Sequence, residues 1–297
     1  NIKCLSVKTL KIFFTPLEFF DNVYVIRPFF SNIVKIIYTN KPTSTAIIPA
    51  HTKVFFQLKN IEIRLNMCKK TILHKIQSPK ITYHHNADNL GYGAAHNIAI
   101  RESIYDDVPY HLVVNSDIVL TAEALETMLT FMIQHSEVGS LMPKVVYPNG
   151  QLQYLCKLLP TPIDVFGRRF LPKRLINRRN QTYEMRASGY DKLMNVPYLS
   201  GCFMLLRTKA VQQAKLFDER FFMYPEDMDL TRRIHRNYLT IYFPHATIIH
   251  NHEKASYKSL KMLWIHAVNM CKYFNKWGWF CDKERDLFNE TAIKEYL

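Results

Sequence analysis

Residues 111–134, HLVVNSDIVLTAEALETMLTFMIQ, carry the clearest structural signal of the chain. His111–Val114 predicts a short buried strand, which stops at the polar run Asn115-Ser116-Asp117. Thr121 stands where a helix N-cap is expected, and we expect Gly139 to close the helix that follows. Apolar residues recur along this helix at helical spacing, namely Leu125, Met128, Leu129, Met132 and Ile133. A strand followed by a helix is the repeating unit of α/β folds.

The same alternation of strands and helices continues on both sides of this segment. Upstream, Ile81–His84 predicts a strand and residues 93–104 a helix, while downstream Cys202–Leu206 predicts a strand and residues 208–215 a helix. Pro225 is expected to open a further helix, because proline is favoured at the first helical position. The other expected elements are an irregular excursion over 143–195, strands at Leu239–Phe243 and Thr247–His250, and a tail helix over Ser256–Trp279. This order predicts an α/β sandwich with a largely parallel central sheet.

The first 80 residues differ in composition from the rest of the chain. They hold no glycine and carry 13 Lys and Arg against 3 Asp and Glu, whereas residues 81–297 carry 26 against 22. Val34–Tyr38 and Thr52–Leu58 predict strands, and Ile61–Ile76 predicts a helix. We therefore expect three units, which are a segment over 1–80, a core over 81–255, and a C-terminal helix and tail over 256–297.

Size and composition indicate an ordinary folded protein. The 297 residues are 48% hydrophobic and 22% charged. No run of about 18 apolar residues predicts a transmembrane helix, and no signal peptide is expected. Six scattered cysteines without a CxxC pair are expected to be free thiols of a cytoplasmic protein. The net charge of +14 lies mainly in the first 80 residues, so we expect no nucleic-acid partner.

Polar residues follow the predicted strands, and open α/β sheets bind ligands at the ends of their strands. Asp117 comes three residues after His111–Val114, with Asn115 two residues before it. A carboxylate there suits a Mg²⁺ or Mn²⁺ ion that neutralises a diphosphate. The alternative is an Asx turn that caps the next helix. His250 ends the predicted strand Thr247–His250, and His252 lies two residues later. Either one of these histidines completes a metal site, or both are ordinary core or surface residues.

Two helix starts have similarly open interpretations. The run Asn89–Asn97, NLGYGAAHN, joins a strand to a helix, so its glycines either let the backbone approach an anion or only form the turn. Glu226, Asp227 and Asp229 lie in the first turn of the helix that Pro225 opens. They either stabilise the helix dipole or supply a general base for a sugar hydroxyl.

Taken in this order, the clusters resemble glycosyltransferase family 2, in particular its rhamnosyltransferase-like bacterial members. The resemblance extends over about residues 81–280. Its matching stretches are Asn86–Ile100, His111–Asp117, Val196–Leu206, Phe217–Arg232 and Ile248–Ser256. The resemblance implies a GT-A fold, the Rossmann-like sandwich of nucleotide-diphospho-sugar transferases. It also implies an inverting transfer of a sugar from a nucleotide-diphosphate donor, assisted by Mg²⁺ or Mn²⁺.

The resemblance also implies roles for individual residues. Asp117 corresponds to the last acidic residue of the family's DxD-type motif, which binds metal and nucleotide diphosphate, and Asn115 stands at the first acidic position. Asp227 corresponds to the proposed catalytic base, with Glu226 beside it. The other correspondences are Gly201 beneath the sugar, Asn89, Gly91 and Asn97 in the turn beside the nucleotide, and His250 at the metal or diphosphate.

The first 80 residues depart from this family. The family opens with strands that end in Thr-Tyr-Asn and in Asp-Asn, and Val34–Tyr38 is at most a counterpart of the second strand without its Asp. Three explanations stay open: a diverged nucleotide-binding half, an unrelated sequence joined to a truncated enzyme, or a reading-frame error. The chain is therefore either a transferase or an inactive relative that binds a sugar nucleotide.

The resemblance implies that the acceptor is a growing cell-surface polysaccharide or a lipid-linked saccharide, with rhamnose as a candidate donor sugar. The tail helix predicts peripheral contact with the inner face of the cytoplasmic membrane, because it combines lysines with large aromatic residues. Packing on the domain is the alternative. The residues concerned are Lys258, Lys261, Trp264, Lys272, Tyr273, Phe274, Lys276, Trp277, Trp279 and Phe280.

Overall fold

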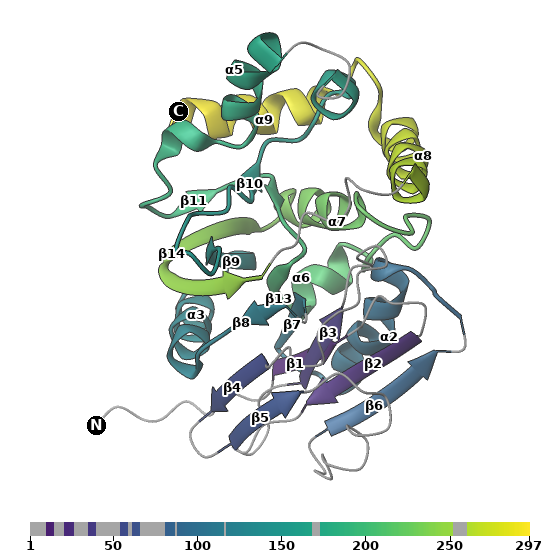
Figure 1. Cartoon of the computed structure of the whole chain (residues 1–297), viewed down its shortest axis with the longest axis vertical. Helices are drawn as coiled ribbons and strands as arrows, with labels where there is room; N and C mark the ends of the chain where they lie inside the picture. Colours follow the sequence, from purple (N-terminus) through teal and green to yellow (C-terminus); the bar gives the residue numbers. More distant parts are fainter. Residues whose placement is uncertain are drawn as a thin grey trace.

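The computed structural model describes six strands before residue 87, and then residues 88–297 apart from 116, 168–172 and 252–259. In this part of the chain, helices flank a central sheet, and a further helical layer lies beyond them (Figure 1). None of the described helices is long and apolar enough to cross a membrane.

The central sheet combines parallel and antiparallel pairs. Its strands are β1 (Leu10–Phe14), β2 (Asp21–Ile26), β3 (Lys35–Thr39), β6 (Ile81–Asn86), β7 (Tyr110–Asn115), β8 (Ile118–Val119), β9 (Val138–Val146), β11 (Met194–Asn195), β13 (Phe203–Arg207) and β14 (Leu239–His250). They lie in the order β11, β14, β9, β13, β7, β1, β3, β2 and β6, and β8 pairs with β14. The pairs β14–β9, β7–β1 and β7–β3 are parallel, whereas β13 is antiparallel to both of its neighbours. The predicted α/β class and the parallel pairing are confirmed, but the sheet is mixed and not largely parallel, because antiparallel pairs outnumber the parallel ones.

Helices cover both faces of this sheet because its buried strands are apolar on both sides. The helices are α2 (Tyr92–Tyr105), α3 (Ala122–Gln134), α6 (Thr208–Gln213) and α7 (Glu226–His235), and Figure 1 shows α3 on one side of the sheet with α2 on the other. In β13, Phe203 and Leu205 join the core beneath α3, whereas Met204 and Leu206 join the core beneath α2, α6 and α7. This alternation is the two-residue repeat of a strand.

The predicted start of α3 is confirmed and its predicted end is wrong. The backbone N–H of Ala124 donates to Thr121 Oγ1 at 3.2 Å, which is an N-cap hydrogen bond. The helix ends at Gln134, and Gly139 lies inside β9 instead. A Cβ atom at Gly139 would lie 2.6 Å from Cβ of Tyr238. The glycine is therefore required for the close approach of the Tyr238 and Ile234 side chains, not for a helix end.

Two further predictions need correction. The strands expected at Leu239–Phe243 and Thr247–His250 are one strand, β14, with a register shift between Phe243 and Thr247. Pro244 lies in this irregularity, as expected for a residue without a backbone N–H. The helix expected over Ile61–Ile76 is wrong in its described part, because β4 (Val54–Leu58) and β5 (Ile61–Leu65) form an antiparallel hairpin. Residues 66–76 lie outside the described residues.

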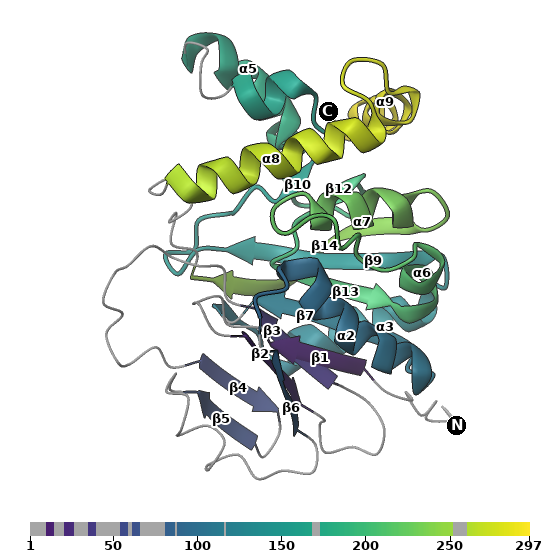
Figure 2. The same cartoon turned by 90° about the vertical axis from the view of Figure 1, so that its right-hand side faces the viewer.

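The C-terminal segment forms two helices, α8 (Leu260–Trp277) and α9 (Lys283–Tyr296), of which only the first was predicted. Figure 2 shows α8 crossing the molecule beyond α7 and leading into α9. Tyr273 and Phe274 are buried in an apolar cluster with Met228 of α7. The start of α9 is tied to α7, since the buried Arg232 donates to both carboxylate oxygens of its N-cap Asp282, at 2.7 and 2.6 Å. Most of the tail therefore packs on the domain.

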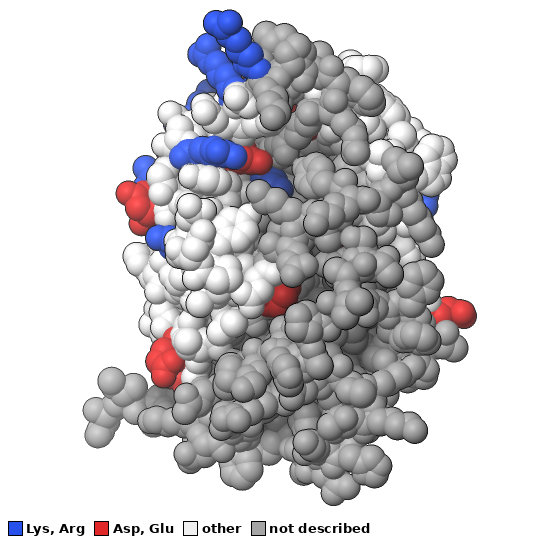
Figure 3. Space-filling model, viewed as in Figure 1, with Lys and Arg blue, Asp and Glu red and all other residues white. Residues whose placement is uncertain are grey.

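The excursion over 143–195 is only partly irregular. Its first residues complete β9, and its later elements are β10 (Cys156–Lys157), η1 (Ile163–Gly167), α5 (Lys173–Tyr183), η2 (Arg186–Ser188) and β11, while β10 pairs with β12 (Tyr198–Leu199). Figure 3 shows Lys and Arg side chains at the end of the molecule where α5 lies, and Arg174 and Arg178 of this helix are exposed. The described cysteines, Cys156, Cys202, Cys271 and Cys281, are free thiols.

Candidate active site

Three of the predicted site residues lie at the same edge of the central sheet. Asn115 ends β7 and His250 ends β14, and the pairing through β9 and β13 makes these two strands run in the same direction. Gly201 comes just before β13, which runs the opposite way, so it reaches the same edge. The backbone N–H of Asn115 donates to the carbonyl oxygen of Cys202 at 2.9 Å. The structure therefore brings together segments that are far apart in the sequence.

Asp117 lies beside His250 because the backbone holds both residues. Ile118 of β8 is paired with His250 of β14, and the N–H of Asn251 donates to the carbonyl oxygen of Asp117 at 2.9 Å. Oδ2 of Asp117 is 3.3 Å from Nε2 of His250. The Asp117 side chain is 37% exposed while that of His250 is 5% exposed, so the pair is open to ligands from the carboxylate side.

Gln153 determines which imidazole nitrogen faces Asp117. Nε2 of Gln153 donates to the carbonyl oxygen of His250 at 2.9 Å, which leaves Oε1 of the same amide 2.9 Å from Nδ1 of His250. An amide oxygen only accepts, so Nδ1 carries a proton. In the neutral ring, Nε2 then presents its lone pair to the Asp117 carboxylate. Two electron-rich atoms in contact require a proton or a cation between them.

This arrangement fits a divalent cation. A carboxylate oxygen and a neutral imidazole nitrogen are both ligands that Mn²⁺ accepts, and the second nitrogen of a ligating histidine is commonly held by a hydrogen bond such as that to Gln153. No group of three or more His, Cys, Asp or Glu among the described residues is placed to hold a metal. A cation bound by Asp117 and His250 would therefore take its other ligands from outside these side chains.

Asp227 is a buried carboxylate, 4% exposed, in the first turn of α7. Its Oδ2 accepts from the N–H of Gly201 at 2.6 Å, and its Oδ1 accepts from the N–H of Met228 at 2.7 Å. Both hydrogen bonds stabilise the ionised form. A Cβ atom at Gly201 would lie 2.8 Å from Cβ of Asp227, so the absence of a side chain at Gly201 permits this contact.

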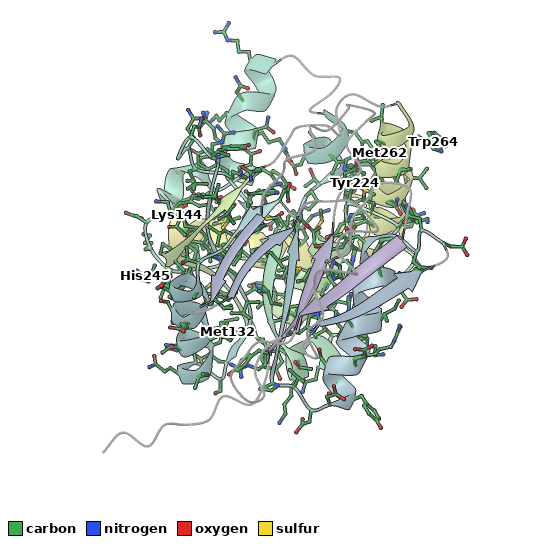
Figure 4. All side chains as sticks on the ribbon, turned by 60° about the horizontal axis from the view of Figure 1, so that its bottom comes forward. Met132, Lys144, Tyr224, His245, Met262 and Trp264 are labelled. Carbon is green, nitrogen blue, oxygen red and sulfur yellow. The ribbon has the colours of Figure 1, made fainter. Side chains whose placement is uncertain are left out.

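Glu226 precedes Asp227 and is also buried, at 1% exposure. It lies close to the start of α2, since a Cβ atom at Gly93 would be 3.6 Å from Cβ of Glu226. Burial, together with the negative charge of Glu226, raises the pKa of Tyr224 to about 12. The Tyr224 ring contacts the His266 ring edge-on at 4.8 Å, and Figure 4 shows Tyr224 on the side of the molecule where α8 lies.

The turn before α2 has the geometry expected of a tight connection. The N–H of Gly91 donates to Oδ1 of Asn89 at 3.1 Å, and Gly91 has a φ of +84°. A Cβ atom there would lie 2.5 Å from the carbonyl oxygen of Phe222. A glycine is thus required twice, for its backbone conformation and for its close contact. Asn89 is exposed, so it remains accessible to a ligand at this turn.

Asn97, which the resemblance places beside the nucleotide, makes its contacts within the protein. Its side chain donates to the carbonyl oxygen of Phe217 and accepts from the N–H of Phe217, both at 2.9 Å. Its Nδ2 also lies 2.9 Å from Oε1 of Glu219. Asn97 is 1% exposed and fastens α2 to the segment before α7.

Asp229, the third carboxylate of this helix start, has a structural role. It is fully buried and accepts from Lys276 at 2.5 Å, from Trp277 at 2.9 Å and from Arg233 at 2.8 Å. Lys276 and Trp277 thereby join α8 to α7, whereas Arg233 belongs to α7 itself. His252 and Ser116 lie outside the described residues.

Sequence reasoning missed two residues of this site. Gln153 follows β9 in the segment expected to be irregular, and its partner His250 is 97 positions away. Tyr92 belongs to the motif around Gly91, but its hydroxyl donates to the carbonyl oxygen of Gly201, 109 positions away. Contacts between residues so far apart cannot be predicted from a local sequence pattern. The one available signal was the position of Tyr92 between two glycines at the start of a helix.

Comparison with known proteins agrees with the motifs. The family model described as glycosyl transferase family 2 matches residues 67–214. The N-acetylglucosaminyl-diphospho-decaprenol L-rhamnosyltransferases of two Mycobacterium tuberculosis strains, CDC 1551 / Oshkosh and ATCC 25618 / H37Rv, are each 29% identical to the chain over 179 residues. The match covers 55% of this chain and 56% of each relative, so the chain spans about half the length of these relatives.

Two solved structures share similarity at low identity. The crystal structure of GalNAc-T7 with UDP, GalNAc and Mn²⁺ has a TM-score of 0.38 and 9% identity, covering 56% of this chain and 31% of that one. Residues 1–349 of S. aureus TarS give a TM-score of 0.34 and 18% identity, covering 62% of this chain and 47% of that one. The family model matches about half of the chain and includes the turn before α2, Asp117 and Gly201. On this match and on its ordered motifs, the chain belongs to glycosyltransferase family 2.

Proposed function

We propose that this chain transfers a sugar, with inversion, from a nucleotide-diphosphate donor to a hydroxyl group of a saccharide or a lipid-linked saccharide. The observation that carries the proposal is the convergence of two functional groups at one sheet edge in a family 2 chain. One is the Asp117–His250 pair, 3.3 Å apart, and the other is the buried carboxylate of Asp227 against Gly201. The Asp117–His250 pair is suited to bind a cation at the diphosphate leaving group, and Asp227 is suited to accept the proton of the acceptor hydroxyl.

Asp117 and His250 would hold Mg²⁺ or Mn²⁺. When bound there, such an ion neutralises the negative charge that develops on the departing nucleoside diphosphate. Asp117 supplies the exposed oxygen, while Gln153 keeps the imidazole of His250 turned toward it. Asn115, 4% exposed at the end of β7, fixes the backbone from which Asp117 projects, because its N–H is bonded to Cys202.

Asp227 would act as the general base. Its carboxylate accepts the proton of the acceptor hydroxyl as the acceptor oxygen bonds to the anomeric carbon and the bond to the diphosphate oxygen breaks. One displacement on the face opposite the leaving group inverts the anomeric centre. The N–H groups of Gly201 and Met228 fix the orientation of this carboxylate.

The donor sugar is proposed to be rhamnose, and the acceptor is proposed to be a polyprenyl-diphosphate-linked saccharide of the cell envelope. Both proposals are supported by the Mycobacterium tuberculosis relatives, which are N-acetylglucosaminyl-diphospho-decaprenol L-rhamnosyltransferases. The turn at Asn89 and Gly91, in front of α2, would lie beside the nucleotide.

Donor binding and turnover test this function directly. The purified chain is titrated with nucleoside diphosphates in a thermal-shift assay, with and without Mn²⁺, since a ligand of the folded state raises the melting temperature. We expect one nucleotide to raise the melting temperature, and only in the presence of Mn²⁺. We also expect sugar transfer from the corresponding donor to a lipid-linked N-acetylglucosamine. Binding without transfer to any acceptor would favour an inactive sugar-nucleotide-binding relative. A cooperative melt that no nucleotide shifts would refute the donor site.

A lipid-linked acceptor would bring the chain to a membrane surface, and we propose peripheral contact through the outer side of α8 and the turn after it. The aromatic residues of this region are divided: Tyr273 and Phe274 are buried, whereas Trp264 is 71% and Phe280 is 80% exposed. Figure 4 shows Trp264 at the outside of α8, pointing away from the body of the protein. Exposed Trp and Phe favour the lipid interface.

A further inference from the structure

We propose that Tyr92 is a positioning residue for Asp227, acting through Gly201, and that it couples the turn at the start of α2 to the base of the reaction. The inference deepens the proposed function and rests on it in one respect, which is the role of Asp227 as the base.

A continuous line of hydrogen bonds connects the two residues. The Tyr92 hydroxyl donates to the carbonyl oxygen of Gly201, and the N–H of Gly201 donates to Oδ2 of Asp227 at 2.6 Å. All three groups are buried, with Tyr92 at 2% and Asp227 at 4% exposure. The carbonyl oxygen of Gly201 is thus bonded to a side chain of α2, and its N–H is bonded to the carboxylate of Asp227.

The position of Gly201 decides the position of the carboxylate. One oxygen of Asp227 accepts from the N–H of Met228, within its own helix, and the other accepts from Gly201, which lies outside α7 and helps to orient the group. Gly201 has no side chain that packs it in place, and a Cβ atom there would collide with Asp227. Its main chain must be fixed by other means, and the Tyr92 hydroxyl does this.

Tyr92 is itself fixed, so its hydroxyl is a firm anchor. Its N–H donates to the carbonyl oxygen of Phe222 at 3.0 Å, directly after Gly91. Its ring packs against the His96 ring at 4.5 Å and edge-on against Phe217 at 6.0 Å. Movement of the turn at Gly91 therefore moves the hydroxyl, and with it Gly201 and Asp227. A donor that orders this turn also orders the base.

The test is Tyr92→Phe, which keeps the ring and removes the hydroxyl. We expect kcat to fall about tenfold or more, because small displacements of a catalytic group are costly, while the donor KM stays within about twofold. Tyr110→Phe is the matched control. Its buried hydroxyl also donates to a carbonyl oxygen, that of Met132 at 3.3 Å, but it lies beneath α3, away from the site. A similar loss of melting temperature in both variants, with a loss of kcat only in Tyr92→Phe, would separate positioning from stability.

A double-mutant cycle identifies the residue through which Tyr92 acts. In an Asp227→Glu background the carboxylate is already displaced, so Tyr92→Phe should then cost less than about twofold in kcat. Full additivity of the two effects, or an unchanged kcat in Tyr92→Phe, would overturn the inference.

A second readout does not depend on turnover. Hydrogen exchange of the Gly201 amide should be about tenfold faster in Tyr92→Phe than in the wild type, because the main chain of Gly201 loses the hydrogen bond that fixes its carbonyl oxygen. The exchange should be unchanged in Tyr110→Phe. A wild-type chain without activity would refute the proposed function. The exchange rate would then still decide the coupling, since equal rates in Tyr92→Phe and the wild type would refute it.

Discussion

Nε2 of His250 lies 3.3 Å from Oδ2 of Asp117, and the amide of Gln153 determines that it is this nitrogen which faces the carboxylate. His250 ends β14 and Asp117 lies in the loop after β7, so the pair forms only when the two strands lie in the same sheet. It also separates two roles. Asp117 and His250 would contact the cation, whereas Gln153 only orients the imidazole.

Removing the Gln153 amide should therefore weaken metal binding without removing a ligand. In Gln153→Met, which keeps the length of the side chain, we expect the affinity for Mn²⁺ in the presence of the preferred nucleoside diphosphate to fall about 10- to 100-fold. Isothermal titration with Mn²⁺ measures this change. Gln151→Met is the control, because Gln151 is exposed and two residues away. Equal affinities in the wild type and Gln153→Met would show that Gln153 does not orient His250 for the ion.

The two aspartates of α7 should separate catalysis from stability. Asp227→Asn removes the proposed base, so we expect kcat to fall by about 10²- to 10⁴-fold while the nucleoside diphosphate still binds. Asp229→Asn weakens the ion pairs with Lys276 and Arg233, which should lower stability by about 3 kcal/mol or more and leave kcat largely intact.

Steady-state kinetics, thermal-shift binding of the nucleotide and urea unfolding compare these variants. Loss of nucleotide binding in Asp227→Asn to the same extent as loss of turnover would contradict the assignment of a base. So would a larger loss of kcat in Asp229→Asn than in Asp227→Asn.

Local patterns predicted the elements that depend on local physics. The cap at Thr121 and the apolar strand before Asp117 follow from neighbouring residues, so their predictions agree with the structure. Gly139 was misinterpreted because a glycine near a helix end suggests a C-cap, whereas the actual constraint is Tyr238, far along the chain. The β4–β5 hairpin was misinterpreted because the short apolar run of β5 fits a strand and a helix equally well.

The candidate site shows the same division. Its carboxylates and glycines could be found from their positions beside predicted strands and helix starts. Which of them share contacts could not, because the contacts of Asp227 with Gly201 and of Asn97 with Phe217 span 26 and 120 positions. Asp229 looked identical to Asp227 in sequence. Only its partners in α8 reveal that it is structural.

Membrane contact should depend on the two exposed aromatic residues and not on the buried ones. In Trp264→Ala/Phe280→Ala, we expect flotation with anionic vesicles at low salt to fall several-fold, since each large aromatic side chain contributes about 1.5–3 kcal/mol when transferred from water. Tyr105→Ala is the control, because Tyr105 is 90% exposed but belongs to α2. Equal flotation of the wild type and the double variant, or no flotation of either, would refute this surface.

His96 should make the fold sensitive to mild acid. It is fully buried, and no described group forms a hydrogen bond with either ring nitrogen. Burial lowers the pKa of His96 from 6.5 to about 3 in the folded chain. The unfolded chain therefore binds a proton between pH 6.5 and 3 that the folded chain does not, and stability present above pH 6.5 is lost as the pH falls through this window. From pH 7 to pH 5 we expect His96 to cost about 2 kcal/mol.

The variant His96→Leu removes this proton and should flatten the pH dependence. Urea unfolding at pH 7 and pH 5 measures the difference in each protein. His235, whose pKa burial lowers to about 4, titrates in the same direction and remains in the variant, so about half of the acid loss should persist. His245→Leu, at an exposed residue of β14, should keep the full wild-type loss. If His96→Leu lost as much stability between the two pH values as the wild type, another group would be responsible for the acid sensitivity.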